Sequence, residues 1–515
     1  MAGETTSPTG VIAPESHSGD LALECAAVVV GTGAGGAMMA RRLAEAGVDV
    51  IALEMGKAHK PSDFNQREDE MFEALFQQRG AQATDDQLIR ILSGIGVGGS
   101  TVHNTNLCRR TPDPLLERWA SEHGVSGADP TTMAPQFAAT EAELDVTLMG
   151  PSAMNRNNAL FKQGVEALGW RGGFLHHNRK GCLRSGFCEL GCAYDAKQNA
   201  AKVLIPGAIA AGARVYAGAR VERVLVEQGR TVGVAGAIVD PDSGARRHGF
   251  TVKAKVVCLA GSAVRSPALL QASGITDPAG LTGRNFRCHP GAIVAAVFKD
   301  PVESWRGIPQ SYECTELLGF EDDSKRIWMV PGAAHPIGSA VMTPGFGPDH
   351  MRMMRLYPRT AAVIVMVDEL ASGAVTARPD GSISIRHALG AEDKAQLSKG
   401  LEAAARILLA AGAEEVLLPW TDPLRIRDES GLAAIQAHGV PDYDLALTGV
   451  HPMGTLRMGD DPRRAVVSSR GEHHGLPGLF VCDGSIFPTA LGVPPQISIY
   501  TFSRHISRFV LEALS

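Results

Sequence analysis

The chain has 515 residues, of which 44% are hydrophobic and 20% are charged, so it is long enough for two domains with sizeable cores. Its formal net charge of −6 provides no basic field, and we expect neither a nucleic-acid partner nor attraction to anionic membranes. The most apolar windows, residues 28–30 and 363–367, are far shorter than the roughly 20 residues that span a bilayer. The sequence therefore predicts no transmembrane segment.

Residues 1–20 are rich in Ser, Thr, Gly and Pro and contain no Lys or Arg. They lack the apolar core of a secretory signal, and we expect a disordered tail. The nine cysteines do not form the dense pattern of a disulfide framework. A reducing cytoplasm is the expected location.

The first predicted elements form a dinucleotide-binding motif. They are a strand at 25–30, a turn reading Gly31-Thr-Gly33-Ala-Gly-Gly36, a helix at 37–46 and a strand at 48–53 that ends on Glu54. In such a motif Gly31 permits the tight turn, Gly33 lets the backbone approach a pyrophosphate, and Gly36 lets helix and strand pack closely. A carboxylate at Glu54 would accept hydrogen bonds from ribose hydroxyls, which disfavours NADP.

Further glycine-rich segments follow along the chain. A cluster at 94–104 contains Gly98-Gly99-Ser100, and its glycine density indicates close approach of the backbone to a flat ligand. A signature beginning at Gly261 follows a predicted strand at 254–260. Near the C-terminus stand His451-Pro-Met-Gly454-Thr455 and Asp483-Gly484-Ser485.

These motifs occur in the same order as in the glucose–methanol–choline (GMC) oxidoreductases, and the sequence resembles that family from about residue 28 to the C-terminus. The resemblance implies an FAD cofactor and an FAD-binding domain assembled from separate stretches. It also implies that Val221 lies beside the adenine, that Asp483 and Gly484 contact the FAD phosphates or ribityl chain, and that Gly99, Ser100 and Asn104 lie against the isoalloxazine.

The expected fold is α/β, with a Rossmann-type FAD-binding domain and an interleaved α+β substrate domain built on an antiparallel sheet. We expect the FAD-binding domain at 21–110, 195–300 and 441–515, and the substrate domain at 111–194 and 301–440. Within 301–440, alternating apolar and polar residues predict strands at 361–368 and 373–386, with a hairpin turn at 379–381. Apolar residues at helical spacing predict a helix at 391–411.

His103 occupies the place where some GMC enzymes, choline oxidase and pyranose oxidase among them, attach FAD covalently through a histidine. Two interpretations are open: a covalent His103–FAD bond, or a histidine packed near the flavin without a bond.

Oxidation of an alcohol requires a base that takes the hydroxyl proton while the hydride moves to flavin N5, and histidine suits that task near neutral pH. His451 matches the histidine that the family uses. The usual second residue, His or Asn, falls on Pro494 here, and proline offers no side-chain hydrogen bond. His103, Asn104 and Gln496 are the candidates to replace it.

A loop at 181–194 places Cys182, Cys188 and Cys192 close together in sequence. Converging thiolates suggest an iron–sulfur cluster or zinc, and the spacing resembles that of GMC dehydrogenases with a [3Fe–4S] cluster. Reduced structural cysteines and a disulfide are the other interpretations. A cluster would give electrons an exit and favour a dehydrogenase over an oxidase.

Residues 327–356 contain five methionines: Met329, Met342, Met351, Met353 and Met354. Methionine adapts to irregular apolar ligands, although such a stretch also suits core or lid packing, and it favours a bulky, apolar alcohol as substrate. The electron acceptor is left open between O2, a quinone and a protein.

The main functional hypothesis is therefore an FAD-dependent alcohol dehydrogenase or oxidase. Two alternatives remain: a lyase of the hydroxynitrile type, which the proline at position 494 motivates, and a flavin-bearing electron-relay subunit, which the cysteine loop motivates.

Overall fold

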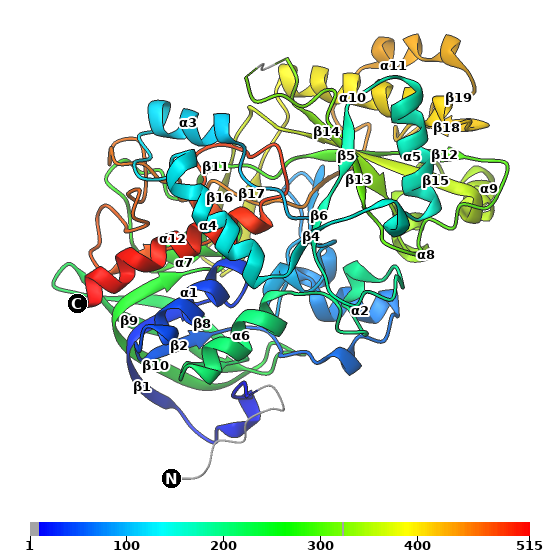
Figure 1. The fold of residues 1–515 in the computed structure, drawn as a ribbon. Coiled ribbons are helices and arrows are strands. Elements are labelled where there is room, and N and C mark those ends of the chain that lie inside the picture. Colours follow the sequence, from blue (N-terminus) through cyan, green and yellow to red (C-terminus); the bar gives the residue numbers. More distant parts are fainter. Residues whose placement is uncertain (1–9, 322–323) are drawn as a thin grey trace.

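The computed structural model describes residues 10–321 and 324–515 (Figure 1). The dinucleotide motif forms as predicted: β1 (Leu21–Val30) leads through the glycine turn into α1 (Ala34–Glu45), which returns to β2 (Val50–Leu53). The two strands pair in parallel, with Ala27 opposite Val50. Because α1 covers this sheet, the second half of β1 is buried, which explains its unbroken apolar run.

The first sheet has the strand order β7-β2-β1-β10-β9-β8, and β21 pairs with β10. Its remaining strands are β7 (Arg214–Tyr216), β8 (Ala219–Glu227), β9 (Arg230–Val239), β10 (Arg246–Leu259) and β21 (Leu479–Val481). The first part of β10 runs antiparallel to β9, and its last part lies parallel between β1 and β21. The carboxyl ends of β1, β10 and β21 therefore meet at one edge, where ligands bind in open α/β sheets.

Helices from distant parts of the chain cover this sheet. Helix α1 packs against both α6 (Ala200–Ala210) and the C-terminal helix α12 (Gln496–Leu514). Helix α4 (Pro130–Glu143), from the stretch assigned to the substrate domain, also packs on α12, where Arg504 binds Glu143 at 2.8 Å. In Figure 1, α12 and α4 lie side by side beyond α1.

The second sheet has the strand order β19-β18-β12-β15-β14-β13-β5, with β20 pairing with both β12 and β3. Its strands are β3 (Ile89–Ile91), β5 (Gly172–Phe174), β12 (Gly291–Val297), β13 (Tyr312–Cys314), β14 (Ile327–Gly332), β15 (Thr360–Val367), β18 (Glu415–Leu417), β19 (Arg425–Ile426) and β20 (Leu447–Gly449). Most neighbours are antiparallel. Strands β3, β12 and β20 come from stretches that the sequence assigned to the FAD-binding domain, so the two domains share more chain than the predicted boundaries suggest.

One face of this sheet is covered by α10 (Ala391–Ala410) and α5 (Arg156–Ala167), which also pack on each other. The two helices approach very closely, because a Cβ atom on Gly164 would lie 2.0 Å from the carbonyl oxygen of Ile407. The predicted strand at 361–368 and helix at 391–411 correspond to β15 and α10.

The predicted hairpin forms as β16 (Gly373–Ala377) and β17 (Ile383–Arg386), and β16 also pairs with β11 (Arg284–Phe286), which makes a separate three-stranded sheet. A further pair joins β4 (Val146–Leu148) and β6 (His176–Asn178). The remaining helices are α2 (Glu68–Leu75), α3 (Asp113–Glu122), α7 (Ser262–Ala272), α8 (Pro336–Met342), α9 (Gly347–Leu356) and α11 (Ala433–His438).

Part of the predicted N-terminal tail is structured. The backbone of Ile12 bridges β7 through hydrogen bonds with Val215 and Ala217, so residues 10–20 differ from the expectation of disorder. Residues 1–9 of the predicted tail lie outside the described residues. Among the helices that the structure describes, none combines the length and apolar character needed to cross a membrane.

Candidate functional site

A cavity of about 1070 Å³ extends from the edge of the first sheet, where β1 and β10 end, to the face of the second sheet. The predicted site residues that line it are Gly31, Gly33, Glu54, Gly99, Ser100, His103, Asn104, Val221, Gly261, His451, Asp483, Gly484 and Pro494. The far end is apolar and includes Ile293, Ile364 and Met366. The fold thus brings residues from five separated motifs to one continuous space.

The glycines of the two loops serve two different purposes here. At Gly36, a Cβ atom would lie 1.9 Å from the carbonyl oxygen of Gly31, so this glycine allows α1 to pack on the turn. At Gly33, the nearest atom to such a Cβ is the Cα of Gly99 at 4.0 Å, so space remains above the helix N-terminus. Gly98, with φ +95°, shapes the second loop without lining the cavity. Gly33 is therefore placed to admit a phosphate group.

Two buried carboxylates organise the loops around this space. Glu54 accepts hydrogen bonds from the backbone and hydroxyl of Thr32, at 3.1 and 2.9 Å, and from the backbone of Gly96 at 3.3 Å. Asp483 accepts from the backbone of Ser262 at 2.9 Å and the hydroxyl of Ser266 at 2.5 Å. Burial raises the pKa of both carboxyl groups, and the donors oppose this shift.

His103 lies on the cavity wall with its ring centroid 4.0 Å from that of Phe76. Its Nε2 atom is buried and has no hydrogen-bond partner among the described residues. Burial lowers the pKa of His103 to about 3, so the imidazole is neutral. A neutral, unpartnered ring nitrogen beside the cavity is available to a bound group.

Asn104 and Gln496 are paired with each other. The Asn104 amide donates to Oε1 of Gln496 at 2.5 Å, and Gln496 donates in turn to the carbonyl of Leu107 at 3.1 Å. Pro494 lies beside them on the cavity wall. Because both amides already have partners, neither is a strong candidate to replace the missing second residue.

A buried lysine that is not among the predicted site residues supports this loop. The Lys197 ammonium donates to the carbonyls of Val102 at 2.9 Å, Asn104 at 2.5 Å and Cys188 at 2.7 Å. Burial lowers its pKa to about 8. Lys197 thus ties the loop that carries His103 to the cysteine loop.

Replacing Lys197 with methionine should lower the free energy of unfolding by about 2 to 4 kcal/mol, because three buried carbonyls lose a charged donor. Urea unfolding of the flavin-loaded protein measures this loss. Lys202→Met is the control, since Lys202 pairs with Asp195 at 3.0 Å nearer the surface and its loss should cost less than about 1 kcal/mol. Equal losses in the two variants would contradict the role given to Lys197.

The His451 ring lines the cavity and contacts a second histidine behind it. Nδ1 of His451 lies 3.0 Å from Nδ1 of His289, and the two rings meet edge to face at 82°. His289 is 2% exposed and does not line the cavity. Burial lowers the pKa of His451 to about 3 and that of His289 well below its ordinary value, so both rings are neutral. With Nδ1 engaged, Nε2 is the nitrogen of His451 left for a ligand.

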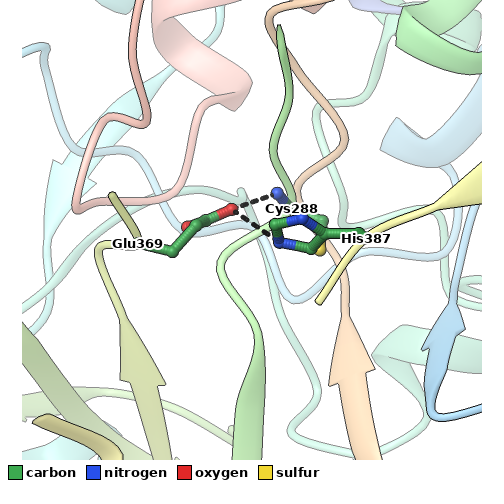
Figure 2. Close-up of side chains that lie close together, drawn as sticks. All are labelled: Cys288, Glu369 and His387. Atoms are coloured by element: carbon green, nitrogen blue, oxygen red, sulfur yellow. Dashed lines mark hydrogen bonds and ion pairs between the residues drawn. The ribbon is translucent and has the colours of Figure 1, made fainter. Parts of the chain in front are cut away.

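Behind this pair, Cys288, Glu369 and His387 form a buried cluster (Figure 2). Their potential ligand atoms all lie within 4.8 Å of one another, and no other group of three meets that limit in the described ranges. Burial raises the pKa of Glu369 to about 8 and that of the Cys288 thiol well above its ordinary value, and it lowers the pKa of His387 to about 4. All three groups are therefore neutral near pH 7, and Glu369 serves to accept backbone N–H groups.

The three cysteines of the predicted cluster lie outside the cavity wall, as free, partly buried thiols. Tetrahedral zinc needs sulfur atoms about 4 Å apart, and these three do not form such a group. Cys182 accepts a hydrogen bond from the backbone of Arg184, and Cys192 accepts one from the backbone of Ala196. The [3Fe–4S] cluster stays a prediction, which assays of iron and acid-labile sulfide per flavin test.

The predicted methionine-rich segment divides between two environments. Met342, Met353 and Met354 line the cavity, Met329 is buried in the second sheet, and Met351 is 55% exposed. Helices α8 and α9 thus contribute an adaptable apolar wall. This favours a ligand with a substantial apolar portion.

The class of protein follows from this arrangement. A dinucleotide-binding α/β sheet and an antiparallel sheet share one cavity, and a histidine, His451, lies on its wall. Family models described as GMC oxidoreductase match residues 72–291 and 370–503. The chain belongs to the GMC oxidoreductase family.

Relatives agree with that assignment, and a solved structure has a similar fold. An uncharacterized GMC-type oxidoreductase of Mycobacterium tuberculosis is 35% identical over 92% of this chain and 73% of its own length. The long-chain-alcohol oxidase FAO3 of Arabidopsis thaliana is 27% identical over 96% of this chain and 69% of its own. Pyridoxine 4-oxidase from Mesorbium loti has a similar fold, with a TM-score of 0.72, 19% identity and coverage of 95% and 99% of the two chains.

Proposed function

We propose that the protein is an FAD-dependent enzyme that oxidises the CH–OH group of an apolar alcohol, with His451 as the base that takes the hydroxyl proton. The observation that carries the proposal is the position of His451, whose free Nε2 lies on the wall of a cavity that joins the glycine loops to an apolar chamber. The long-chain-alcohol oxidases among the relatives support the substrate class.

The residues present fit FAD. Space above Gly33 at the N-terminus of α1 suits a pyrophosphate, and Val221 on β8 lines the cavity where an adenine would lie. The unpartnered His103 lines the same cavity as His451. When bound, FAD would accept the hydride from the alcohol carbon. His451 would hold the hydroxyl oxygen and receive its proton at Nε2, while the apolar wall excludes water from the carbon chain.

Anaerobic mixing of the flavin-loaded enzyme with primary, secondary and sterol alcohols tests the proposal. We expect an alcohol with a long or bulky apolar group to bleach the oxidised flavin absorbance. Failure of every alcohol would overturn it. Cleavage of a cyanohydrin while the flavin stays oxidised would instead support the lyase alternative, and reduction only through a protein partner would support an electron-relay subunit.

We further propose that FAD is attached covalently through His103, because its buried Nε2 is neutral and lacks a partner in the described part of the chain. Acid precipitation should then leave yellow flavin in the protein pellet, and the His103→Ala variant should release it to the supernatant. Flavin in the supernatant of the unmodified protein would contradict the bond. His176→Ala, at an exposed histidine, is the control.

The pH dependence of flavin reduction should lack an acid limb near 6.5. Because the pKa of His451 is lowered to about 3, the ring stays neutral as the pH falls from 8 to 5, and its protonation does not remove the base. Stopped-flow reduction rates across that range should therefore stay nearly constant. A tenfold fall per unit of pH below 6.5 would show instead that the base has an ordinary histidine pKa.

A further inference from the structure

Two backbone N–H groups determine where His289 carries its hydrogen. Leu491 and Gly492 donate to Nε2 of His289 at 3.2 and 3.0 Å. A nitrogen that accepts two hydrogen bonds is unprotonated, and a neutral imidazole must then carry its hydrogen on Nδ1. That hydrogen lies toward Nδ1 of His451, 3.0 Å away.

The backbone holds His289 in an unusual conformation to achieve this contact. Its φ of +50° is in the left-handed region, directly before Pro290, which costs about 1 to 3 kcal/mol for a residue with a side chain. Glu369 stabilises the conformation by accepting the backbone N–H groups of Cys288 at 2.5 Å and His289 at 3.1 Å. Such over-determined strain is typical of functional positions.

We infer that His289 is a positioning residue that sets the tautomer of His451, holding it in the resting enzyme with its hydrogen on Nε2, toward the cavity. His451 then presents a donor to a ligand oxygen. The role of this residue rests on the proposed function, in which His451 contacts the substrate hydroxyl.

In this tautomer His451 cannot accept a proton at Nε2. The base form is reached when Nε2 of His451 releases its hydrogen to water in the cavity, the hydrogen between the rings moves to Nδ1 of His451, and a proton from solvent reaches Nε2 of His289, so that the pair neither gains nor loses a proton. Asp368 is the carboxyl group nearest that nitrogen, with Oδ1 4.0 Å away, and burial raises its pKa to about 6. Because Leu491 and Gly492 donate to Nε2 of His289, that nitrogen stays bare and the donor form of His451 is favoured. A change to the base form requires His289 to change its own tautomer.

Nuclear magnetic resonance of the flavin-loaded enzyme, labelled with 15N in histidine and containing no alcohol, reads the tautomer directly. We expect the hydrogen between the rings to be bonded to Nδ1 of His289 and Nδ1 of His451 to be bare. In His289→Asp, a carboxylate replaces the donor, and His451 should instead carry its hydrogen on Nδ1. A bridging hydrogen on His451 in the unmodified enzyme, or the same His451 tautomer in both proteins, would overturn the inference.

Kinetics provide a second readout that a purely structural role would not change. His289→Asp and His289→Leu both remove the imidazole, but only aspartate supports the base form of His451. With equal flavin content confirmed, the aspartate variant should reduce its flavin at least about tenfold faster than the leucine variant. Equal rates would overturn the inference. If no alcohol reduces the unmodified enzyme, the proposed function fails while the resonance experiment still decides the tautomer.

Discussion

Replacing His451 with alanine is expected to lower the rate of anaerobic flavin reduction by 10² to 10⁴-fold, which corresponds to about 3 to 5 kcal/mol of activation free energy. The loss would follow from the place of the ring on the wall of the cavity, where, under the proposed function, Nε2 contacts the hydroxyl group. Stopped-flow absorbance at saturating alcohol measures the rate, so that a change in substrate binding is separated from a change in chemistry.

The variant must retain its fold and flavin for the comparison to be valid. His451 is half-buried, and among the described residues its ring makes one side-chain hydrogen bond, to His289, so the alanine variant should keep a native flavin spectrum. His176→Ala changes an exposed histidine on β6 and should leave the rate unchanged. An unchanged rate in His451→Ala would remove this residue as the base.

The N-terminal motif was predictable because its requirements are local. The turn from β1 into α1 needs glycines at fixed spacing, and the buried parallel strands need apolar runs, so a short stretch of sequence contains both signals. The same holds for the hairpin of β16 and β17, where Asp380 and Gly381 mark the turn. Helix α10 was predictable from the helical spacing of its buried apolar residues alone.

The partner of His451 was not predictable in the same way. His289 is distant from His451 in sequence, and it lies outside the glycine, histidine and cysteine motifs. His289 lies behind the cavity because the folded chain places the start of β12 beside the segment at 491–492. The role of Lys197 was not predictable for a similar reason. Its three acceptors are backbone carbonyls, and every residue type has one, so the sequence does not indicate the contacts. The proline after His289 gives no such signal, because a residue before proline favours an extended backbone, whereas His289 has a φ of +50°.

Interleaving of the two domains limited the boundary prediction. Strand β12 continues directly from the first domain's chain into the second sheet, and β3 and β20 join it from opposite ends of the sequence. Short strands of three residues provide little periodicity, so no pattern separates them from loops. Their pairing depends on contacts that only the folded chain creates.

The glycine turn permits a test that separates folding from cofactor binding. In Gly36→Ala, the new Cβ would lie 1.9 Å from the carbonyl oxygen of Gly31 and 3.0 Å from the Cβ of Ala260, so α1 must move away from the sheet. We expect the flavin-free protein to lose at least about 2 kcal/mol of stability, because a tightly packed interior does not accommodate an added methyl group against backbone.

In Gly33→Ala, the Cβ meets nothing closer than 4.0 Å, so the flavin-free protein should unfold at the same urea concentration as the unmodified one. Its FAD affinity should nevertheless fall at least about tenfold, or 1.4 kcal/mol, because the methyl group occupies the space above the N-terminus of α1 where the pyrophosphate would approach. Urea unfolding without flavin and FAD titration by fluorescence quenching measure the two effects. If Gly33→Ala bound FAD normally, the cofactor would not use this turn, and the position assigned to its phosphates would be wrong.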